Sequence, residues 1–256
     1  MVEWLAHAPL PLLAAVVFLA LYLAAALVLV VLRTVSRLGH AETLGPLSPG
    51  ILAPMGLIFG LLVGFLVADV WSDQGDASAA TSREASALRD VDLLMATFPA
   101  EHERVQALLR EQIDDYVDDE WAQMGDGGAT LSVAPAGLVA VQRIALDLPV
   151  ATEGQRVAQE HVVDAVDRAL EARRTRLVLS TSAIDPLRLG ALYLVAVVTL
   201  AATGCVQADR LRRAAVATGL LATAMALAMT LLCAQAAPFA GYFAISPELL
   251  LQVRPT

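Results

Sequence analysis

The chain has 256 residues, of which 57% are hydrophobic and 17% are charged, and its formal net charge is -9. Because a soluble domain normally carries about 25% charged residues, the deficit indicates that part of the chain is surrounded by lipid. The negative charge gives no electrostatic support to nucleic-acid binding. The two cysteines, Cys205 and Cys233, are too few to form a disulfide framework or a zinc site by themselves.

Two apolar runs lie in the first third of the chain. The first extends from Pro9 to Leu32 without a charged residue, and the second extends from Ile51 to about Trp71. About 20 helical residues cross the hydrocarbon layer of a membrane, so each run is long enough to span it. The loop between them is rich in proline and glycine, which marks a break between two helices.

Residues 73–186 form a polar region that is rich in helix signals. Between Ala100 and Met124 the apolar residues recur every three or four positions, which predicts an amphipathic helix. A second such helix is predicted from Thr152 to about Ser182, and Thr152 with Gln155 forms the pattern of a capping box. The segment from Ser78 to Phe98 is expected to continue the second span out of the membrane. These helices can bury their apolar stripes against one another as a bundle.

The third and fourth apolar runs extend from Leu187 to Val206 and from Ala214 to about Ala237. The link between them is so short that the two helices must form an antiparallel hairpin. The predicted fold is therefore an all-α membrane protein, with four transmembrane helices in two hairpins and a helical bundle inserted between the second and third spans. The predicted parts are a first transmembrane hairpin (1–72), an extramembrane helical domain (73–186), a second transmembrane hairpin (187–238) and a C-terminal tail (239–256).

The arginines of the short loops predict the orientation in the membrane. Loop 33–50 and loop 207–213 carry two and three arginines respectively, and basic residues in short loops tend to stay in the cytoplasm. We therefore expect both loops to be cytoplasmic, and the termini and domain 73–186 to lie outside. The arginines near the start of the third span favour the opposite orientation. The expected location is the bacterial cytoplasmic (inner) membrane.

Glycines recur every fourth residue in the second span, at Gly56, Gly60 and Gly64. Glycines at this spacing form a groove that lets another helix approach closely. One interpretation is helix packing, within one subunit or between subunits. The other is a pore-lining helix whose narrow part is shaped by Phe59 and Phe65.

The spans are expected to be nearly free of charge, with Asp69 as their only ionisable residue, at the end of the second span. Ion-coupled transporters usually place charged residues within the membrane, so this pattern argues against such a transporter. It does not argue against a channel, because an apolar constriction can gate by dewetting.

The polar region contains an acidic stretch and a basic cluster. The acidic residues are Asp114, Asp115, Asp118, Asp119 and Glu120, and the basic ones are Arg173, Arg174 and Arg176. The acidic stretch lacks the spacing of an EF-hand, which favours a solvated face. Its alternative is a divalent-cation site made by Asp115, Asp118, Asp119 and Glu120 with other segments. The arginines are expected to pair with the acidic helix, or else to attract anions at a pore mouth or contact lipid headgroups.

Signals for catalysis are poor. His102 and His161 lie on separate predicted helices, and no second pair of ligands completes a metal site with them. No nucleophile has a neighbouring base. We therefore predict that the protein is not an enzyme and has no cofactor, and the two histidines do not define a metal site.

Four stretches together resemble the bacterial bestrophin-like membrane family. They are the second span with its exit (56–88), the YVDDEWAQM segment (116–124), the arginine-pair helix that leads into the third span (171–187) and the Pro-Phe-x-Gly and Ser-Pro tail (238–250). The sequence departs from the family pattern where Ala236 and Ala237 replace an acidic-basic pair and where Asp69 replaces an apolar residue.

The resemblance implies four spans and a relation to bestrophins, which are oligomeric anion channels. It also implies that the second span lines the pore, and that the helical region is cytosolic, against the loop charges. The first functional hypothesis is thus a homo-oligomeric ion channel in a lipid bilayer, conducting anions such as chloride. The alternative is a non-conducting membrane scaffold or sensor whose helical domain binds a partner or a divalent cation such as calcium.

Overall fold

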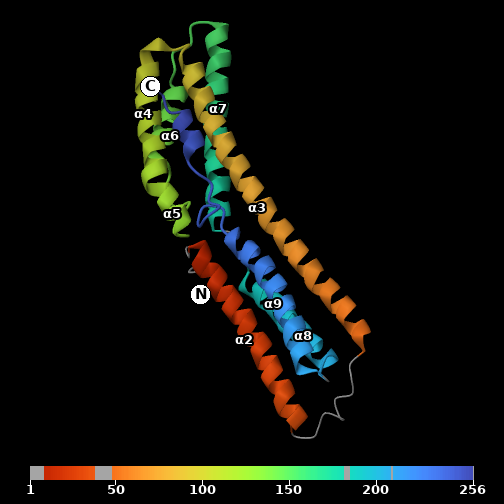
Figure 1. Ribbon diagram of the computed structural model, residues 1–256. Helices are drawn as coiled ribbons and strands as arrows, with labels where there is room; N and C mark the ends of the chain where they lie inside the picture. The colour runs from red at the N-terminus through yellow and green to blue at the C-terminus, as the bar shows by residue number, and fades with distance from the viewer. Residues whose placement is uncertain (1–8, 38–47, 182–184, 209, 256) are drawn as a thin grey trace. The chain divides into compact units, whose positions relative to one another are not determined.

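The computed structural model describes residues 9–37, 48–181, 185–208 and 210–255, and within these ranges every regular element is helical (Figure 1). Four helices are long and apolar enough to cross a membrane. They are α2 (Leu10–Arg37), α3 (Leu52–Met95), α8 (Pro186–Val206) and α9 (Leu211–Ala234). The all-α fold and the four apolar helices are therefore as predicted.

The chain divides into two compact units. The membrane unit comprises Met1–Trp71 and Ala183–Ala236, and the helical unit comprises Ser72–Ser182 and Ala237–Thr256. Helix α3 contributes to both, because it continues without interruption from the second span to Met95. The C-terminal tail, expected as a part of its own, packs within the helical unit.

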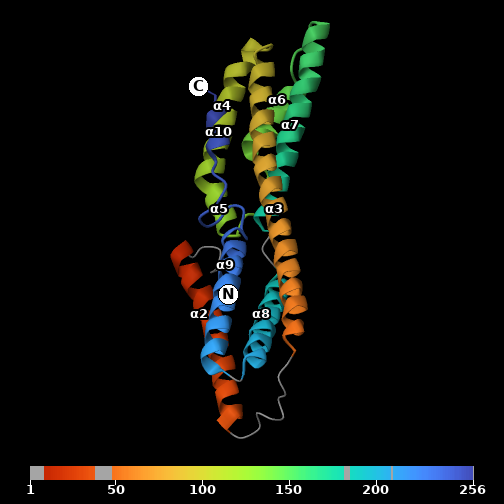
Figure 2. The same ribbon diagram turned by 45° about the vertical axis from the view of Figure 1, so that its right-hand side comes forward.

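In the membrane unit, α2 packs against α8 and α9, which also pack against each other. Both views place α8 and α9 between α2 and the first half of α3 (Figures 1 and 2). The shared core contains large apolar side chains from all four helices, including Leu21, Phe59, Leu192, Leu200, Met225 and Met229. The opposite faces carry exposed apolar residues such as Leu23, Leu194 and Leu227, as expected for helices in contact with lipid.

Gly204 lets α2 approach α8 closely. A Cβ atom at this position would lie 2.8 Å from Cδ1 of Leu32 and 2.9 Å from Cγ1 of Val28. In lipid no hydrophobic force drives helices together, so small residues that allow close van der Waals packing favour their association. The sequence interpretation assigned no role to this glycine.

The helical unit is a bundle made by the second half of α3, three further long helices and short elements. The helices are α4 (Pro99–Asp115), α5 (Trp121–Gly125), α6 (Ala136–Leu146), α7 (Glu153–Ser180) and α10 (Glu248–Gln252). Pro99 occupies the first turn of α4, where its missing N–H costs nothing. The predicted capping box of α7 is confirmed, because Gln155 N–H donates to the Thr152 hydroxyl while the Gln155 side chain accepts from Thr152 N–H.

The amphipathic segment 100–124 is not one regular helix. After α4 the backbone forms a π turn, Tyr116–Glu120, in which the N–H of Trp121 donates to the carbonyl of Tyr116 five residues earlier. The apolar stripe nevertheless stays buried, since Val105, Leu109 and Ile113 lie in the bundle core. The π turn lies within the acidic stretch and shifts the positions of the residues that follow it around the helix.

Candidate functional site

The glycine face of α3 is open in the membrane unit. A Cβ atom at Gly56, Gly60 or Gly64 would meet nothing within 4 Å outside the helix itself. The neighbouring residues on this face, Leu57 and Leu61, are exposed and apolar. The groove predicted from the glycine spacing therefore contains no other segment of the described chain.

The two phenylalanines near the glycines face different environments. Phe65 is 71% exposed, whereas Phe59 is 9% exposed and packs in the core of the membrane unit. Six residues turn a helix by about 240° beyond one full rotation, so the two side chains cannot share one face. Of these two phenylalanines, only Phe65 can contact lipid, a pore or another subunit.

Two polar contacts join the last turn of the second span to its neighbours. The carboxylate of Asp69 accepts from the Arg188 guanidinium at 2.6 Å, and the Trp71 indole donates to the Gln235 side chain. The prediction that Asp69 is the only ionisable residue of the spans is wrong. Arg188 also lies within a span, as the third residue of α8. Both members of the ion pair are more than half exposed, so their attraction is weakened by solvent.

The helical unit contains a buried ion cluster formed by Glu84, Glu120, Arg173 and Arg176. The Arg176 guanidinium donates to both oxygens of Glu84, at 2.7 and 3.1 Å, and to Glu120 at 2.7 Å. Arg173 donates to Glu120 through Nε at 2.8 Å and through a second nitrogen. The side chains of Glu84 and Arg176 are completely buried. With all four groups ionised, the charges of the cluster cancel.

Aromatic rings cover the arginines of the ion cluster. The Arg176 guanidinium carbon lies 4.8 Å from the ring centre of Trp121 and 5.3 Å from that of Tyr116. A guanidinium placed over an aromatic face gains further electrostatic stabilisation, and more so when water is excluded. The Trp121 indole also donates to the carbonyl of Ile245 at 3.0 Å, which connects the cluster to the C-terminal tail.

Burial changes the proton affinities in the ion cluster. It raises the pKa of the Glu84 carboxyl, against the opposing effect of the adjacent Arg176 guanidinium. Burial disfavours the charge of Arg176, but the carboxylates of Glu84 and Glu120 more than offset this and raise its pKa. Arg176 therefore stays charged, and Glu84 takes up a proton more readily than an exposed glutamate. Burial also raises the pKa of Tyr116 well above its usual value, so its hydroxyl is neutral.

The predicted charged residues divide between this cluster and the surface. Arg173 and Arg176 pair with Glu120, while Arg174 is exposed and pairs with Glu171 at 3.1 Å. On the acidic stretch, Asp114 binds the tail residue Arg254 through two hydrogen bonds of 2.8 Å. The carboxylates of Asp115, Asp118 and Asp119 lie on the exposed side of the π turn. Glu84 was not among the predicted site residues. The sequence held one signal for it: Glu84 lies on the same helix face as the apolar residues Leu88, Val91 and Met95, which predicts that its carboxylate is buried.

The surface of the helical unit has several hollows that are lined by charged side chains. One, of about 320 Å³, lies beside the ion cluster and is lined by residues that include Asp115, Asp119, Glu120 and Arg173. Among the residues that the structure describes, no three histidine, cysteine or acidic side chains are grouped as metal ligands. The divalent-cation site therefore stays a prediction.

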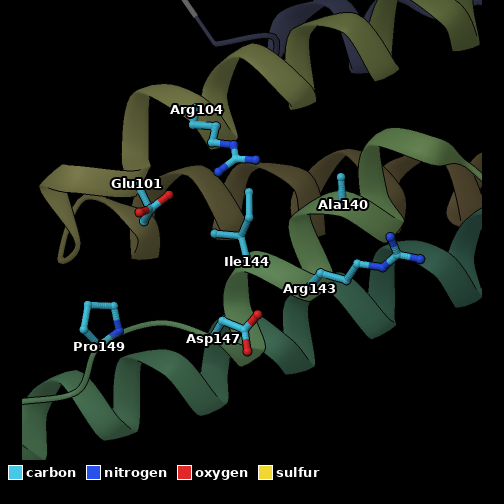
Figure 3. A pocket seen from close by; sticks show the side chains of 7 residues that line it. All are labelled: Glu101, Arg104, Ala140, Arg143, Ile144, Asp147 and Pro149. Atoms are coloured by element: carbon cyan, nitrogen blue, oxygen red, sulfur yellow. The ribbon is translucent and has the colours of Figure 1, made fainter.

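Another hollow, of about 370 Å³, lies between α4 and α6 (Figure 3). Its charged residues are Glu101 and Arg104 from α4, with Arg143 and Asp147 from α6 and the residue that follows it. Figure 3 shows Arg104 directed towards Ile144 and Arg143 directed away from it. Two positive and two negative groups leave no net charge, so this hollow does not select an anion or a cation by its charge.

Comparison with known proteins identifies the family. A model of the Bestrophin-like domain matches residues 19–250. The chain belongs to the Bestrophin-like family. It is thus a membrane protein, in keeping with the four apolar helices. No curated protein matches it in sequence.

Solved structures of a bacterial bestrophin homolog share the fold. A crystal structure of a bacterial bestrophin homolog from Klebsiella pneumoniae matches with a TM-score of 0.69 at 11% identity, over 94% of this chain and 95% of that chain. A single-residue variant of that homolog matches with the same score and identity, over 94% and 96% of the two chains. At this identity the likeness establishes the fold and not the activity.

Proposed function

We propose that this Bestrophin-like protein is a homo-oligomeric ion channel in which the second span faces the symmetry axis. The observation that carries the proposal is the open, uncharged face of α3 at Gly56, Gly60 and Gly64. Small residues on a transmembrane helix favour close contact with another helix, and a ring of identical subunits brings the same face of each subunit to the axis. Anions such as chloride are the proposed permeant ions, by analogy with bestrophins.

Phe65 is the proposed constriction of this pore. Its ring is exposed beside the glycine face, whereas Phe59 is held in the core of its own subunit. An apolar ring of side chains resists hydration and can close a pore by dewetting. The Asp69–Arg188 ion pair, one helical turn further along α3, would place charges at the pore mouth rather than in its narrow part.

For the chain in its membrane we propose two transmembrane hairpins, α2 with α3 and α8 with α9. The arginines of loops 33–50 and 207–213 favour a cytoplasmic position for both loops in the cytoplasmic (inner) membrane. The termini and the helical unit would then lie outside, whereas analogy with bestrophins favours the other side. Accessibility of single engineered cysteines to an impermeant reagent in intact cells would decide between the two.

Conductance in planar bilayers tests the channel proposal. Phe65→Ala should raise single-channel conductance or open probability, because it removes the apolar constriction. Leu27→Ala is the matched control, since Leu27 is an exposed apolar residue on α2. Absence of currents from the reconstituted oligomer over several ions and voltages would contradict the channel; equal currents from both variants would contradict the role of Phe65.

A non-conducting scaffold or sensor is the second candidate. The observation that favours it is the hollow beside the π turn, where the exposed carboxylates of Asp115 and Asp119 face solvent. These carboxylates would bind a partner protein or a divalent cation such as calcium. The double change Asp115→Asn with Asp119→Asn should abolish calcium binding measured by titration calorimetry, and leave any conductance unchanged. Unchanged calcium binding by that variant would reject the cation version.

A further inference from the structure

The chain forms a closed loop soon after α9 ends. The N–H of Ile245 donates to the carbonyl of Pro238 at 2.9 Å, and this hydrogen bond joins the two ends of the loop. Phe239 at its base is buried and packs edge-on against Trp121, with ring centres 5.5 Å apart. Gly241 has a φ of 80°, a backbone conformation that residues other than glycine rarely adopt. The loop is therefore a defined turn with an anchored base.

The loop presents two aromatic rings to the outside. Tyr242 is 76% exposed and Phe243 is 41% exposed, and their ring centres lie 5.2 Å apart in an edge-to-face arrangement. We call these two residues the aromatic tip. No residue from Ala214 through Pro247 is charged, so the tip has no charged neighbour in the sequence. Two large rings left in water would forgo the favourable free energy of burying them.

A hydrogen bond joins the aromatic tip to α3 soon after the apolar stretch of this helix. The side chain of Gln74 donates to the carbonyl of Phe243 at 2.9 Å. Gln74 lies three residues after Trp71 on the same uninterrupted helix, which is a rise of about 4.5 Å. Trp71 is itself exposed and ends the apolar stretch of the helix. The aromatic tip thus contacts α3 at Gln74, which follows the apolar stretch of this helix by about one turn.

Tyrosine and tryptophan are enriched at this level of membrane proteins, because their rings have an apolar body and a polar group that suit the headgroup layer. The ion pair between Asp69 on α3 and Arg188 on α8 ends the uncharged stretch of the second span, and charged groups are costly inside the hydrocarbon layer. An uncharged tip can enter the headgroup layer without removing a charge from water, whereas a tip that faced water would gain nothing from its two rings.

From these observations we propose that the aromatic tip, Tyr242 with Phe243, is an interfacial anchor that inserts its rings into the headgroup layer of the bilayer. The partner is the lipid surface and not a second protein. The proposal does not depend on ion conduction. The same loop also contacts the ion cluster. The carbonyl of Ile245 accepts a hydrogen bond from Trp121, whose ring covers Arg176.

A spin label at position 242 tests this anchor in the full-length protein reconstituted into nanodiscs. Tyr242→Cys is made in a background with Cys205→Ala and Cys233→Ala, and the label is probed with oxygen, which partitions into lipid, and with a water-soluble nickel chelate. The label should show an oxygen-to-nickel accessibility ratio several-fold higher than a label at Leu146→Cys, an exposed apolar residue on α6 of the same unit. Equal ratios at the two positions would overturn the proposal, and so would protection of position 242 from both reagents, which indicates a protein contact.

A photocrosslinker provides the second measurement, with both native cysteines present. p-Benzoylphenylalanine in place of Tyr242 keeps an aromatic ring at the tip and reacts with neighbouring C–H groups on illumination. Mass spectrometry should detect phospholipid adducts at position 242, as it should for the same replacement at Leu27 on α2. Crosslinks to a second copy of the chain, or no lipid adduct at 242 while Leu27 gives one, would overturn the proposal.

Discussion

The two units of this protein use charge in opposite ways. The membrane unit is held by apolar packing among α2, α3, α8 and α9, and its one interhelical ion pair, as far as the described residues show, lies at the exposed end of the spans. The helical unit instead contains an ion cluster of two arginines and two glutamates, in which the side chains of Glu84 and Arg176 are completely buried. A bundle in water has many polar side chains that can pair with buried charges. Helices in lipid have few such side chains, so a charge among them is harder to pair.

The difference has a consequence for function. In the helical unit the charged groups of the ion cluster are paired with one another within one chain. In the membrane unit the glycine face of α3 is open to the outside. The contacts of the ion cluster are therefore all within one subunit, while the glycine face is open to contact with another subunit or with lipid. A mutation in each unit should show this division.

The largest effect is expected from removing Arg176. Arg176→Ala leaves Glu84 buried without its partner and should lower the free energy of unfolding by roughly 3–5 kcal/mol. Thermal or denaturant unfolding in detergent measures this loss. Arg174→Ala is the matched control on the same helix, because Arg174 is exposed and its pair with Glu171 is worth about 1 kcal/mol or less. Equal destabilisation by the two variants would show that the buried cluster has no special role.

A smaller effect is expected from filling the close contact at Gly204. Gly204→Val adds atoms where Leu32 and Val28 already approach and should destabilise the membrane unit by about 1–3 kcal/mol. Gly219→Val on α9 is the control, since a Cβ there meets nothing within 4 Å. The midpoint of thermal unfolding in detergent compares the two. If both valines have the same effect, the cost is one of helix propensity and not of packing between α2 and α8.

The smallest effect is a change in the dependence of stability on pH. The folded state raises the pKa of Glu84 above its ordinary value of 4.5, so it binds a proton more readily than the unfolded state does. The stability that this raised pKa contributes is therefore fully present below pH 4.5, and it is lost as the pH rises through the folded-state pKa of Glu84.

Glu84→Gln removes this titration and keeps the shape of the side chain. Relative to this variant, the native protein should gain stability as the pH is lowered towards 4.5, as measured by unfolding midpoints in detergent over that range. Parallel pH profiles of the two proteins would contradict a raised pKa at Glu84.

Local features of the sequence predicted much of the fold. The four apolar helices follow from length and hydropathy, and the capping box of α7 follows from Thr152 and Gln155 alone. The separation of Phe59 from Phe65 was also accessible, because six residues on a helix point in different directions. In each case the deciding residues are neighbours in the sequence.

Contacts between distant segments were not accessible in this way. Glu84 and Arg176 are 92 residues apart, and Asp69 and Arg188 are 119 residues apart. Many acidic and basic residues could pair by sequence alone, and only the packing of the helices selects among them. The same holds for the tail, whose docking depends on Gln74, Asp114 and Trp121. The π turn at Tyr116 has no signal in the helical periodicity.

Helix α3 has a mechanical property that follows from its continuity. It runs for 44 residues without a break, which is about 66 Å, and it carries the open glycine face near one end and Glu84 towards the other. Since the turns of one continuous helix are joined by hydrogen bonds, a rotation of either half of α3 about the helix axis would also turn the other half.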